Sequence, residues 1–240
     1  MTAAQVSVSE LTIERVRPGQ PPRAVVAALS FDIRPGERLC LLGPNGAGKT
    51  TVLHAMIGAL PFTGSVSYAG TRLNGSTQNE LRRRVGLVFA DPTEQFFLPT
   101  ARDEVEFGPL QRGVQTDAAS ELGHAALCLV GLEQLASAGP AELSLGEQRR
   151  LALATVLSCS PEVILLDEPT AALDPVARKR VLAAIAGAGA TLVIATHDLD
   201  AALELEADVA LLNAGKLIAL GPASELLRDE ALLRTAGLKG

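Results

Sequence analysis

The stretch from Gly43 to Thr50 has the pattern G-x-x-x-x-G-K-T and constrains the fold more than any other part of the chain. It follows an apolar run at 39–42, which predicts a buried parallel strand, and it precedes a predicted helix from Lys49 to about Ile57. Glycines let the backbone wrap closely around a polyphosphate, and the helix N-terminus adds positive potential. Lys49 would then supply a charge to the terminal phosphates, while the Thr50 hydroxyl would reach Mg²⁺. The predicted phosphate-binding residues are Gly43, Pro44, Asn45, Gly46, Ala47, Gly48, Lys49, Thr50 and Thr51.

Composition narrows the class of protein. The chain has 240 residues, of which 48% are hydrophobic but only 3% aromatic, so it suits one large α/β domain with an aliphatic core. A formal net charge of −6 argues against nucleic-acid binding, which requires basic surface. Cys40, Cys128 and Cys159 are far apart in the sequence. They predict buried thiols in a reducing compartment, because no spacing typical of a disulfide framework or a zinc site is present.

The sequence contains no pattern typical of a targeting or membrane-spanning segment. Residues 1–10 lack a basic region followed by an apolar run, and no apolar run reaches the roughly 18 residues needed to span a bilayer. We therefore expect a soluble cytosolic protein, which leaves room for a membrane-bound partner.

Two kinds of strand pattern occur. Alternating apolar and polar residues at 6–14, 29–33 and 65–68 predict an antiparallel sheet with one face exposed. Continuous apolar runs instead predict buried strands, and they occur at 85–89, 163–166 and 192–195. A Gly- and Pro-rich turn is predicted at 18–22, and a hairpin around 213–215.

Helical patterns separate the buried strands. Residues 100–137 carry apolar side chains at helical spacing without an intervening strand, which predicts an inserted helical subdomain after a polar loop at 90–99. Further helices are predicted at 146–157 and 175–186, and a single leucine-rich helix at the C-terminus. Alternating strands and helices indicate an α/β fold, a mostly parallel sheet with helices on both faces.

Two acidic residues follow the apolar run at 163–166. A buried strand delivers such residues to its carboxyl end, where ligands of open α/β sheets bind. Asp167 suits Mg²⁺ binding, and Glu168 suits polarising a water for attack on a γ-phosphate. The alternative is a strand that simply runs into a helix N-terminus.

A third buried strand ends in Thr196, His197 and Asp198. We expect His197 to lie at the same sheet edge and to contact the γ-phosphate, the alternative being a solvated histidine at a helix start. His54 and His124 have no such placement and are interpreted as structural or exposed.

Ser144 and Glu147 have the spacing of a capping box at the start of the helix predicted from about Gly146. The same hydroxyl and glycine at a helix N-terminus could also bind an anion. The local pattern does not choose between these interpretations.

Taken in order, these motifs resemble those of the ATP-binding cassette (ABC) ATPases. The order is the phosphate loop, LSLGE at 143–147, LLDEP at 165–169, AALDP at 171–175 and ATHD at 195–198. More narrowly, the chain resembles the cobalt/nickel branch of the energy-coupling-factor group. The stretches that carry this likeness are VGLVFADPTEQFFLPTARDEVEFGPLQRG (85–113), LSLGEQRRLALATVL (143–157) and HDLDAALELEADVALLNAGKLIALGPASELL (197–227).

The resemblance implies an ABC ATPase fold over residues 1–240. In it, 1–90 and 155–240 would form the nucleotide-binding core with the antiparallel β subdomain, and 91–154 the helical subdomain. It further implies two copies, a homodimer, that sandwich two Mg²⁺-bound ATP molecules. Each ATP would lie between the phosphate loop of one copy and Ser144, Gly146 and Glu147 of the other.

The resemblance also assigns roles to further residues. Asp174 would cross the dimer seam, Glu168 would be the general base, and His197 would contact the γ-phosphate. The 91–113 region would form a groove for a helix of a membrane subunit, so the chain would be peripheral on the cytoplasmic face of the membrane. The motor would make no direct contact with the transported solute.

Three positions depart from the family pattern. Ala90 stands where a glutamine is usual, so we expect altered coupling of Mg²⁺ to the groove without loss of ATP binding; Gln95 is expected to face the groove. Leu145 replaces a glycine beside the trans phosphate contact, and Glu147 a glutamine. Arg15 stands near the usual adenine-stacking aromatic, and its guanidinium could stack on the base instead.

The function expected from this resemblance is ATP hydrolysis that drives uptake of cobalt or nickel ions through separate membrane subunits. Two alternatives remain: the same motor serving biotin or another vitamin, and a soluble ABC ATPase of iron–sulfur cluster assembly. DNA-repair or chromosome-organising ATPases are disfavoured, because no long heptad insertion fits between Thr51 and Leu143.

Overall fold

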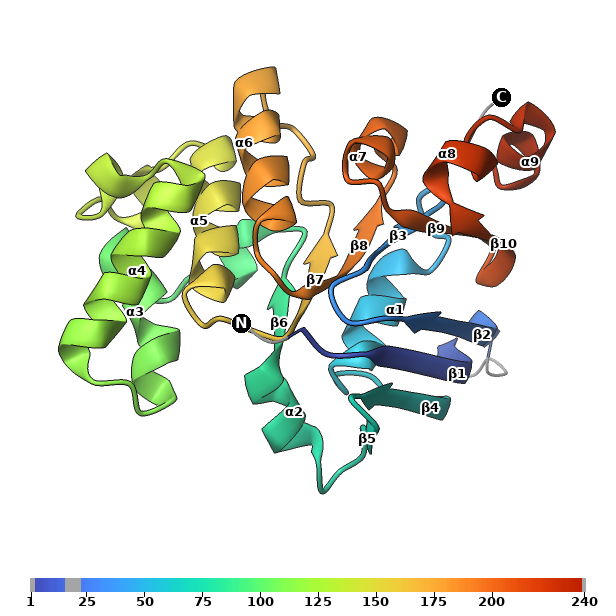
Figure 1. Cartoon of the computed structure of the whole chain (residues 1–240), viewed down its shortest axis with the longest axis horizontal. Helices are drawn as coiled ribbons and strands as arrows, with labels where there is room; N and C mark the ends of the chain where they lie inside the picture. Colours follow the sequence, from blue (N-terminus) through green and yellow to red (C-terminus); the bar gives the residue numbers. More distant parts are fainter. Residues whose placement is uncertain (1–2, 16–22, 239–240) are drawn as a thin grey trace.

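The computed structural model describes residues 3–15 and 23–238. Among these residues, two sheets and the helices around them form the fold (Figure 1). The larger sheet has six strands in the order β10-β9-β3-β8-β7-β6, all parallel except β10. Its strands are β3 Arg38–Leu42, β6 Val85–Val88, β7 Val163–Asp167, β8 Thr191–Thr196, β9 Asp208–Asn213 and β10 Lys216–Pro222.

The central residues of the parallel strands are apolar because both faces of this sheet are covered, and polar residues occur only at the strand ends. One face packs against the antiparallel sheet and the first helix, and the other against the helical layer. Side chains on the first face include Leu39, Leu41, Val163, Leu165, Val193, Ala195, Ala210 and Leu212. Those on the second include Cys40, Leu42, Ile164, Leu166, Leu192, Ile194, Val209 and Leu211.

The predicted antiparallel sheet is present, with strand order β2-β1-β4-β5. Its strands are β1 Val6–Arg15, β2 Arg23–Ile33, β4 Thr63–Tyr68 and β5 Thr71–Arg72. The alternation along β1 changes phase between Val8 and Leu11, where the pairing with β2 shifts its register. Glu10 lies in this irregularity with a φ of 52°, so the bulge keeps Leu11 and Ile13 on the buried face.

Helices occupy both faces of the central sheet, and Figure 1 shows α3, α4 and α5 together on its far side from β1 and β2. The helices are α1 Lys49–Met56, α2 Gln78–Arg84, α3 Ala101–Gln111, α4 Thr116–Val130, α5 Leu145–Leu157, α6 Pro175–Ala186 and α7 Leu199–Glu204. Short 3₁₀ turns are η1 Pro92–Glu94, η2 Glu133–Leu135 and η3 Pro140–Glu142. The helical insertion predicted after residue 100 therefore corresponds to α3 and α4, and α5 returns the chain to the sheet.

Two expectations need correction, and a third is not tested. The single C-terminal helix is wrong: α8 Ala223–Leu226 and α9 Glu230–Thr235 are separate, because Asp229 accepts a hydrogen bond from the Leu232 amide and begins a new helix. The cysteines are not all buried: Cys40 is buried, Cys159 half-buried and Cys128 exposed on α4. The turn predicted at 18–22 lies outside the described residues.

Within residues 3–15 and 23–238, no helix has the length and hydrophobicity needed to cross a membrane.

Candidate functional site

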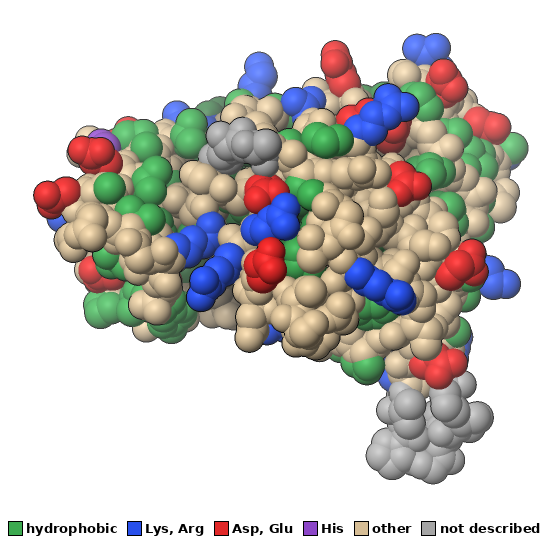
Figure 2. Space-filling model, turned by 60° about the horizontal axis from the view of Figure 1, so that its bottom comes forward, with side chains coloured by type: hydrophobic (Ala, Val, Ile, Leu, Met, Phe, Trp, Pro, Cys, Tyr) green, Lys and Arg blue, Asp and Glu red, His purple; other side chains and the backbone are tan. Residues whose placement is uncertain are grey.

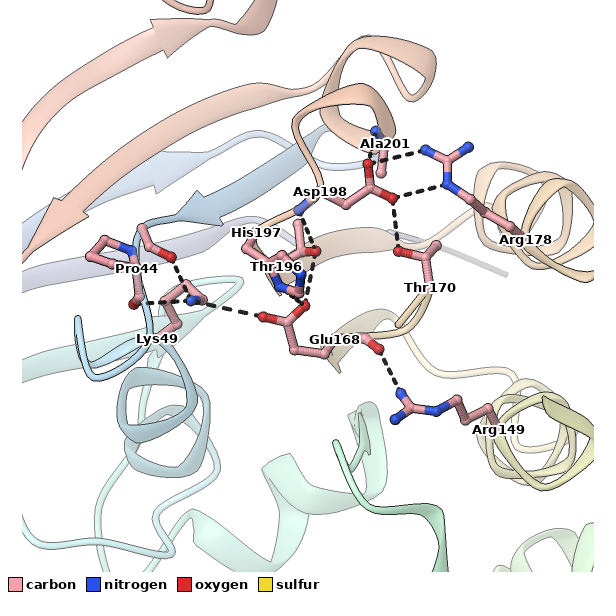
Figure 3. A network of polar contacts seen from close by, with 11 residues as sticks. Pro44, Lys49, Arg149, Glu168, Thr170, Arg178, Thr196, His197, Asp198 and Ala201 are labelled. Atoms are coloured by element: carbon pink, nitrogen blue, oxygen red, sulfur yellow. Dashed lines mark hydrogen bonds and ion pairs between the residues drawn. The ribbon is translucent and has the colours of Figure 1, made fainter. Parts of the chain in front are cut away.

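The candidate site lies where β3, β7 and β8 end. These strands are neighbours and parallel, so their carboxyl ends meet at one sheet edge. The register places Leu42 beside Thr196, and Ala195 beside Asp167. The phosphate loop after β3, Glu168 after β7 and His197 after β8, which are far apart in the sequence, therefore converge there (Figure 3).

The phosphate loop connects β3 to α1 and folds around the Lys49 side chain. The Lys49 ammonium is buried and donates to the carbonyls of Gly43 and Pro44, at 2.7 and 3.3 Å. Gly43 is required by close approach, because a Cβ there would lie 2.3 Å from the Leu212 carbonyl oxygen. Gly48 is the N-cap of α1 and has a φ of 100°, a backbone conformation that residues with side chains rarely adopt. The loop thus holds one cation at a helix N-terminus, which is the arrangement that binds phosphates.

Asp167 ends β7 with its side chain buried at 2% exposure. It accepts a hydrogen bond from the Thr50 side chain, but its Oδ1 has no partner among the described residues. Burial raises the pKa of Asp167 above its ordinary value, the Thr50 hydrogen bond opposes this, and the charge of Glu168 adds to it. A hydroxyl and an unpartnered carboxylate oxygen are the hard donors that Mg²⁺ prefers. The residues present therefore fit a magnesium site.

This burial predicts a pH-dependent difference between the wild type and Asp167→Asn. A carboxyl group with a raised pKa binds its proton more tightly in the folded chain, so ionised Asp167 destabilises the fold without a cation. As the pH rises from about 4, the ordinary value for aspartate, through the raised pKa, the variant should gain stability relative to wild type. Above the raised pKa the difference should stay constant.

Urea unfolding in Mg²⁺-free buffer between about pH 4 and pH 8 measures this difference. Asp208→Asn, at an exposed position that starts β9, is the matched control. If the difference in unfolding free energy between wild type and Asp167→Asn did not change with pH, the raised pKa of Asp167 would be contradicted.

Glu168 brings the remaining predicted residues together. Its Oε2 accepts a hydrogen bond from Thr196 Oγ1 at 3.1 Å and lies 2.9 Å from His197 Nδ1, and its Oε1 lies 3.8 Å from Lys49 Nζ (Figure 3). The backbone of Glu168 has a φ of 48°, which is strained for a residue with a side chain. His197 is 62% exposed, and a cavity of about 490 Å³ extends outward between Glu168 and α7. The carboxylate is thus fixed at the edge of an open, polar depression.

A supporting network around Asp198 was not predicted. Asp198 caps α7 by accepting from the Ala201 amide, and it also accepts from Thr170 Oγ1 and from Nε and Nη2 of Arg178. Burial acts to raise the pKa of Asp198, but the hydrogen bonds led by Arg178 lower it below its ordinary value. The carboxylate stays ionised and locks the turn that carries His197. Only the capping role of Asp198 had a sequence signal, because Arg178 lies on a different helix.

The LSLGE turn has the predicted capping box. Ser144 is the N-cap of α5, its hydroxyl accepts from the Glu147 amide, and its amide donates to the Glu147 carboxylate at 2.8 Å. Hydrogen bonds from Ser144 lower the pKa of Glu147. A Cβ at Gly146 would lie 3.5 Å from Leu173, so this turn adjoins the loop before α6, which Asp174 caps. These contacts explain the local conformation, and they leave Leu145 exposed at the helix N-terminus.

The other positions singled out from the sequence are placed as follows. Arg15 is exposed at the end of β1, opposite Arg23. The His54 ring lies 6.0 Å from that of Phe89, and the exposed His124 lies 3.5 Å from Cys128 Sγ.

The expectation for Gln95 is wrong, because it turns away from the groove. Its amide nitrogen donates to the Ala152 carbonyl at 2.8 Å and to Thr155 Oγ1 at 2.6 Å, both on α5. A part-buried carbonyl and a part-buried hydroxyl on α5 thus replace solvent as the partners of this amide.

Comparison with known proteins identifies the family. The model of the ABC transporter family matches residues 26–171. The nickel import ATP-binding protein NikO of Rhodobacter capsulatus is 44% identical over 85% of this chain and 85% of its own. The energy-coupling factor transporter ATP-binding protein EcfA of Methanothermobacter thermautotrophicus is 37% identical over 88% of this chain and 70% of its own.

Solved structures agree with these relatives. CbiO1 of Clostridium perfringens, part of the ABC transporter complex cbiONQ, superposes with a TM-score of 0.81 at 29% identity, covering 97% of this chain and 94% of that chain. The dimeric ATP-binding cassette MJ0796, bound to ADP and phosphate, has a TM-score of 0.83 at 26% identity, covering 91% and 98%.

The fold and the site thus define an ATP-binding cassette, and the chain belongs to the ABC transporter family of ATP-binding proteins. It is an ATPase that uses ATP with Mg²⁺ and acts as the ATP-binding subunit of a transporter.

Proposed function

We propose that this chain powers an energy-coupling-factor importer that takes up nickel or cobalt ions through separate membrane subunits. The observation that carries the proposal is its similarity, over most of both chains, to a nickel import ATP-binding protein. The likeness to cbiO1, a part of the cbiONQ transporter complex, supports it.

In the proposed chemistry, Glu168 is the general base. Its carboxylate takes a proton from a water that attacks the γ-phosphorus, the bond between this phosphorus and the bridging oxygen breaks, and ADP and phosphate leave. His197 and Thr196 hold that carboxylate in place; the Thr196 hydrogen bond to Oε2 and the 2.9 Å distance from His197 Nδ1 to Oε2 support this role. Lys49 stabilises charge on the phosphates. Thr50 and Asp167 would hold Mg²⁺, which neutralises phosphate charge when bound.

We further propose that a second copy completes each ATP site. Ser144, Gly146 and Glu147 of one copy would approach the ATP held by the phosphate loop of the other, and Asp174 would lie at the seam. Arg15 would stack on the adenine. The likeness to a dimeric cassette supports this arrangement, as does the exposure of Leu145 and of Val176 at the starts of α5 and α6.

The docking surface proposed for the membrane subunit lies on the 91–113 segment and the turn before α5. A cavity of about 350 Å³ there is mostly apolar, and it is lined by Thr93, Phe96, Phe97, Leu98, Pro99, Gly139, Pro140, Ala141 and Gln148. Phe97 is 66% exposed and packs edge-on against Phe107 of α3, with ring centroids 4.9 Å apart. Buried Glu104 accepts from the Phe97 and Leu98 amides, which fixes the loop that presents the ring. An apolar helix face of a membrane protein fits such a surface.

Phe97→Ala is therefore expected to weaken capture of the membrane subunit by about 30-fold, the effect of losing a central aromatic anchor. Quantitative co-purification from detergent-solubilised membranes measures it. Leu129→Ala is the matched control, because Leu129 is 56% exposed on α4 but outside the cavity lining. Equal capture by both variants would rule out Phe97 as an anchor.

The division into a nucleotide-binding core, 1–90 with 155–240, and a helical subdomain, 91–154, is part of the proposal. Close packing of α3, α4 and α5 on one another supports the helical unit. Its second boundary falls within α5, which runs to Leu157 and packs against β6.

The proposed location is the cytoplasmic face of the membrane, where the chain makes no contact with the transported ion.

We also propose that the chain binds no nucleic acid. In support of this, Figure 2 shows Lys and Arg side chains interspersed with Asp and Glu on the face that it presents. Such a surface lacks the single-sign field that attracts nucleic acid.

Uptake by the reconstituted transporter tests the function. The full chain is purified from membranes with its partners, placed in vesicles with ATP, and supplied with Ni²⁺, Co²⁺ or biotin. Metal uptake that requires ATP and is abolished by Glu168→Gln is expected. Biotin uptake would keep the motor role and overturn the metal assignment. Recovery of a soluble scaffold complex instead of a membrane complex would favour the iron–sulfur alternative.

A further inference from the structure

Arg149 on α5 lies between the LSLGE turn and Glu168. α5 begins with the Ser144 cap, and Arg149 is in its second turn. From there its Nη1 donates to the backbone carbonyl of Glu168 at 3.0 Å (Figure 3). This hydrogen bond connects the helix that starts at the LSLGE turn with the residue proposed as general base.

The backbone of Glu168 needs such support. Its φ of 48° lies in the left-handed region, which costs about 1 kcal/mol or more for a residue with a side chain. Three hydrogen bonds hold the backbone of Glu168: its amide donates to the Ala195 carbonyl at 2.8 Å, and its carbonyl accepts from the Ala171 amide at 3.2 Å and from Arg149 Nη1 at 3.0 Å. The Glu168 side chain leaves the same Cα, so its direction depends on all three, and Arg149 supplies the only one of them that comes from α5.

Arg149 does not have the contacts expected of a purely stabilising residue. Its Nε is buried and has no hydrogen-bond partner among the described residues. An unpartnered buried N–H costs about 1–3 kcal/mol, and apolar side chains often replace such groups without loss of stability. A cavity of about 10 Å³ beside Arg149, Asp167 and Glu168 has room for at most one water.

The charge of Arg149 also reaches the loop that begins the docking surface. Hydrogen bonds from Thr93 lower the pKa of Asp91, and the positive charge of Arg149 acts in the same direction. Ala90, directly before Asp91, has only a methyl group and makes no side-chain hydrogen bond. Arg149 is therefore placed between this loop and Glu168.

We propose that Arg149 is a positioning residue for hydrolysis: it fixes the Glu168 peptide relative to α5, so that a shift of α5 against β7 re-aims the Glu168 carboxylate. The proposal rests on the role of Glu168 proposed above. It adds a connection to Glu168, the proposed general base, from the LSLGE turn and from the loop around Asp91 that begins the docking surface.

Arg149→Met tests it in the full-length protein, under conditions in which the wild type hydrolyses ATP. Turnover should fall by about 10- to 100-fold, the effect of a displaced catalytic group. KM and the affinity for a fluorescent ATP analogue should stay within about twofold, because the phosphate loop is untouched. The melting temperature should not fall. Arg149→Lys, which keeps one donor, should restore part of the turnover.

The matched control is Arg38→Met at the start of β3, which removes other arginine-to-carbonyl hydrogen bonds, to Leu205 and Ala186, outside the ATP site and the docking surface. It should leave turnover near the wild-type value. Amide hydrogen exchange of the 167–171 segment gives a reading independent of turnover, and it should accelerate in Arg149→Met alone.

The outcomes separate the two proposals. If Glu168→Gln keeps full turnover, the role of Glu168 itself fails. If Glu168→Gln is inactive while Arg149→Met matches the wild type in turnover and exchange, only the role of Arg149 fails. A parallel loss of melting temperature and ATP affinity in Arg149→Met would likewise overturn it, since that is the signature of a structural residue.

Discussion

Glu168→Gln is expected to reduce ATP hydrolysis by about a thousandfold, within the range typical of a lost general base. Glutamine keeps the shape of the side chain and can still accept from Thr196, but it cannot take a proton from water. ATP binding should be retained or strengthened, because the Glu168 carboxylate lies 3.8 Å from Lys49, next to where phosphate charge would bind. Phosphate release and equilibrium ATP binding, measured on the same preparation, separate the two effects.

The chain offers a matched control for this substitution. Glu206 also has a positive φ, 50°, but it is exposed after α7 and outside the site. Glu206→Gln should hydrolyse ATP at the wild-type rate. Turnover by Glu168→Gln within tenfold of wild type would show that another group accepts the proton.

Lys49→Ala is expected to weaken ATP binding by about 100-fold, as a charge-assisted contact to phosphate contributes about 1.5–3 kcal/mol. The effect should be on affinity, in contrast to Glu168→Gln. The variant also loses the hydrogen bonds from Nζ to Gly43 and Pro44, which hold the loop in its curved form. Titration with a fluorescent ATP analogue at two Mg²⁺ concentrations measures the loss.

Lys179→Ala is the matched control, because Lys179 is exposed on α6 and lies outside the phosphate loop. Its ATP affinity should equal that of the wild type. If Lys49→Ala bound ATP as tightly as Lys179→Ala, the assignment of the phosphate loop would be wrong. Circular dichroism of both variants excludes unfolding as the cause.

Much of the fold could be predicted from the sequence because its determinants are local. The apolar runs at 39–42 and 163–166 are short and continuous, as strands buried on both faces must be, and they form β3 and β7. The Ser144 and Glu147 spacing predicted a capping box that the structure contains. Even the phase change along β1 is visible in the positions of Val8 and Leu11, although the bulge that causes it is not.

Other features depend on contacts between segments distant in sequence, and local patterns carry no signal for them. Gln95 turns inward because α5, more than 50 residues later, offers it two acceptors. Arg178 donates to Asp198, which is 20 residues away in the sequence. The local pattern around Arg178 predicts only that it lies on the solvent-exposed face of a helix.

The sequence by itself determined the phosphate loop, the order of strands and helices, and the acidic and histidine residues that follow two of the strands. Only the tertiary structure decided that Lys49, Glu168 and His197 meet, since this depends on β3, β8 and β7 being neighbours in one sheet. It also decided the strained peptide of Glu168 and its hydrogen bond from Arg149. The physical reason is that propensity and periodicity act over a few residues, whereas strand order and side-chain direction follow from packing of the whole chain.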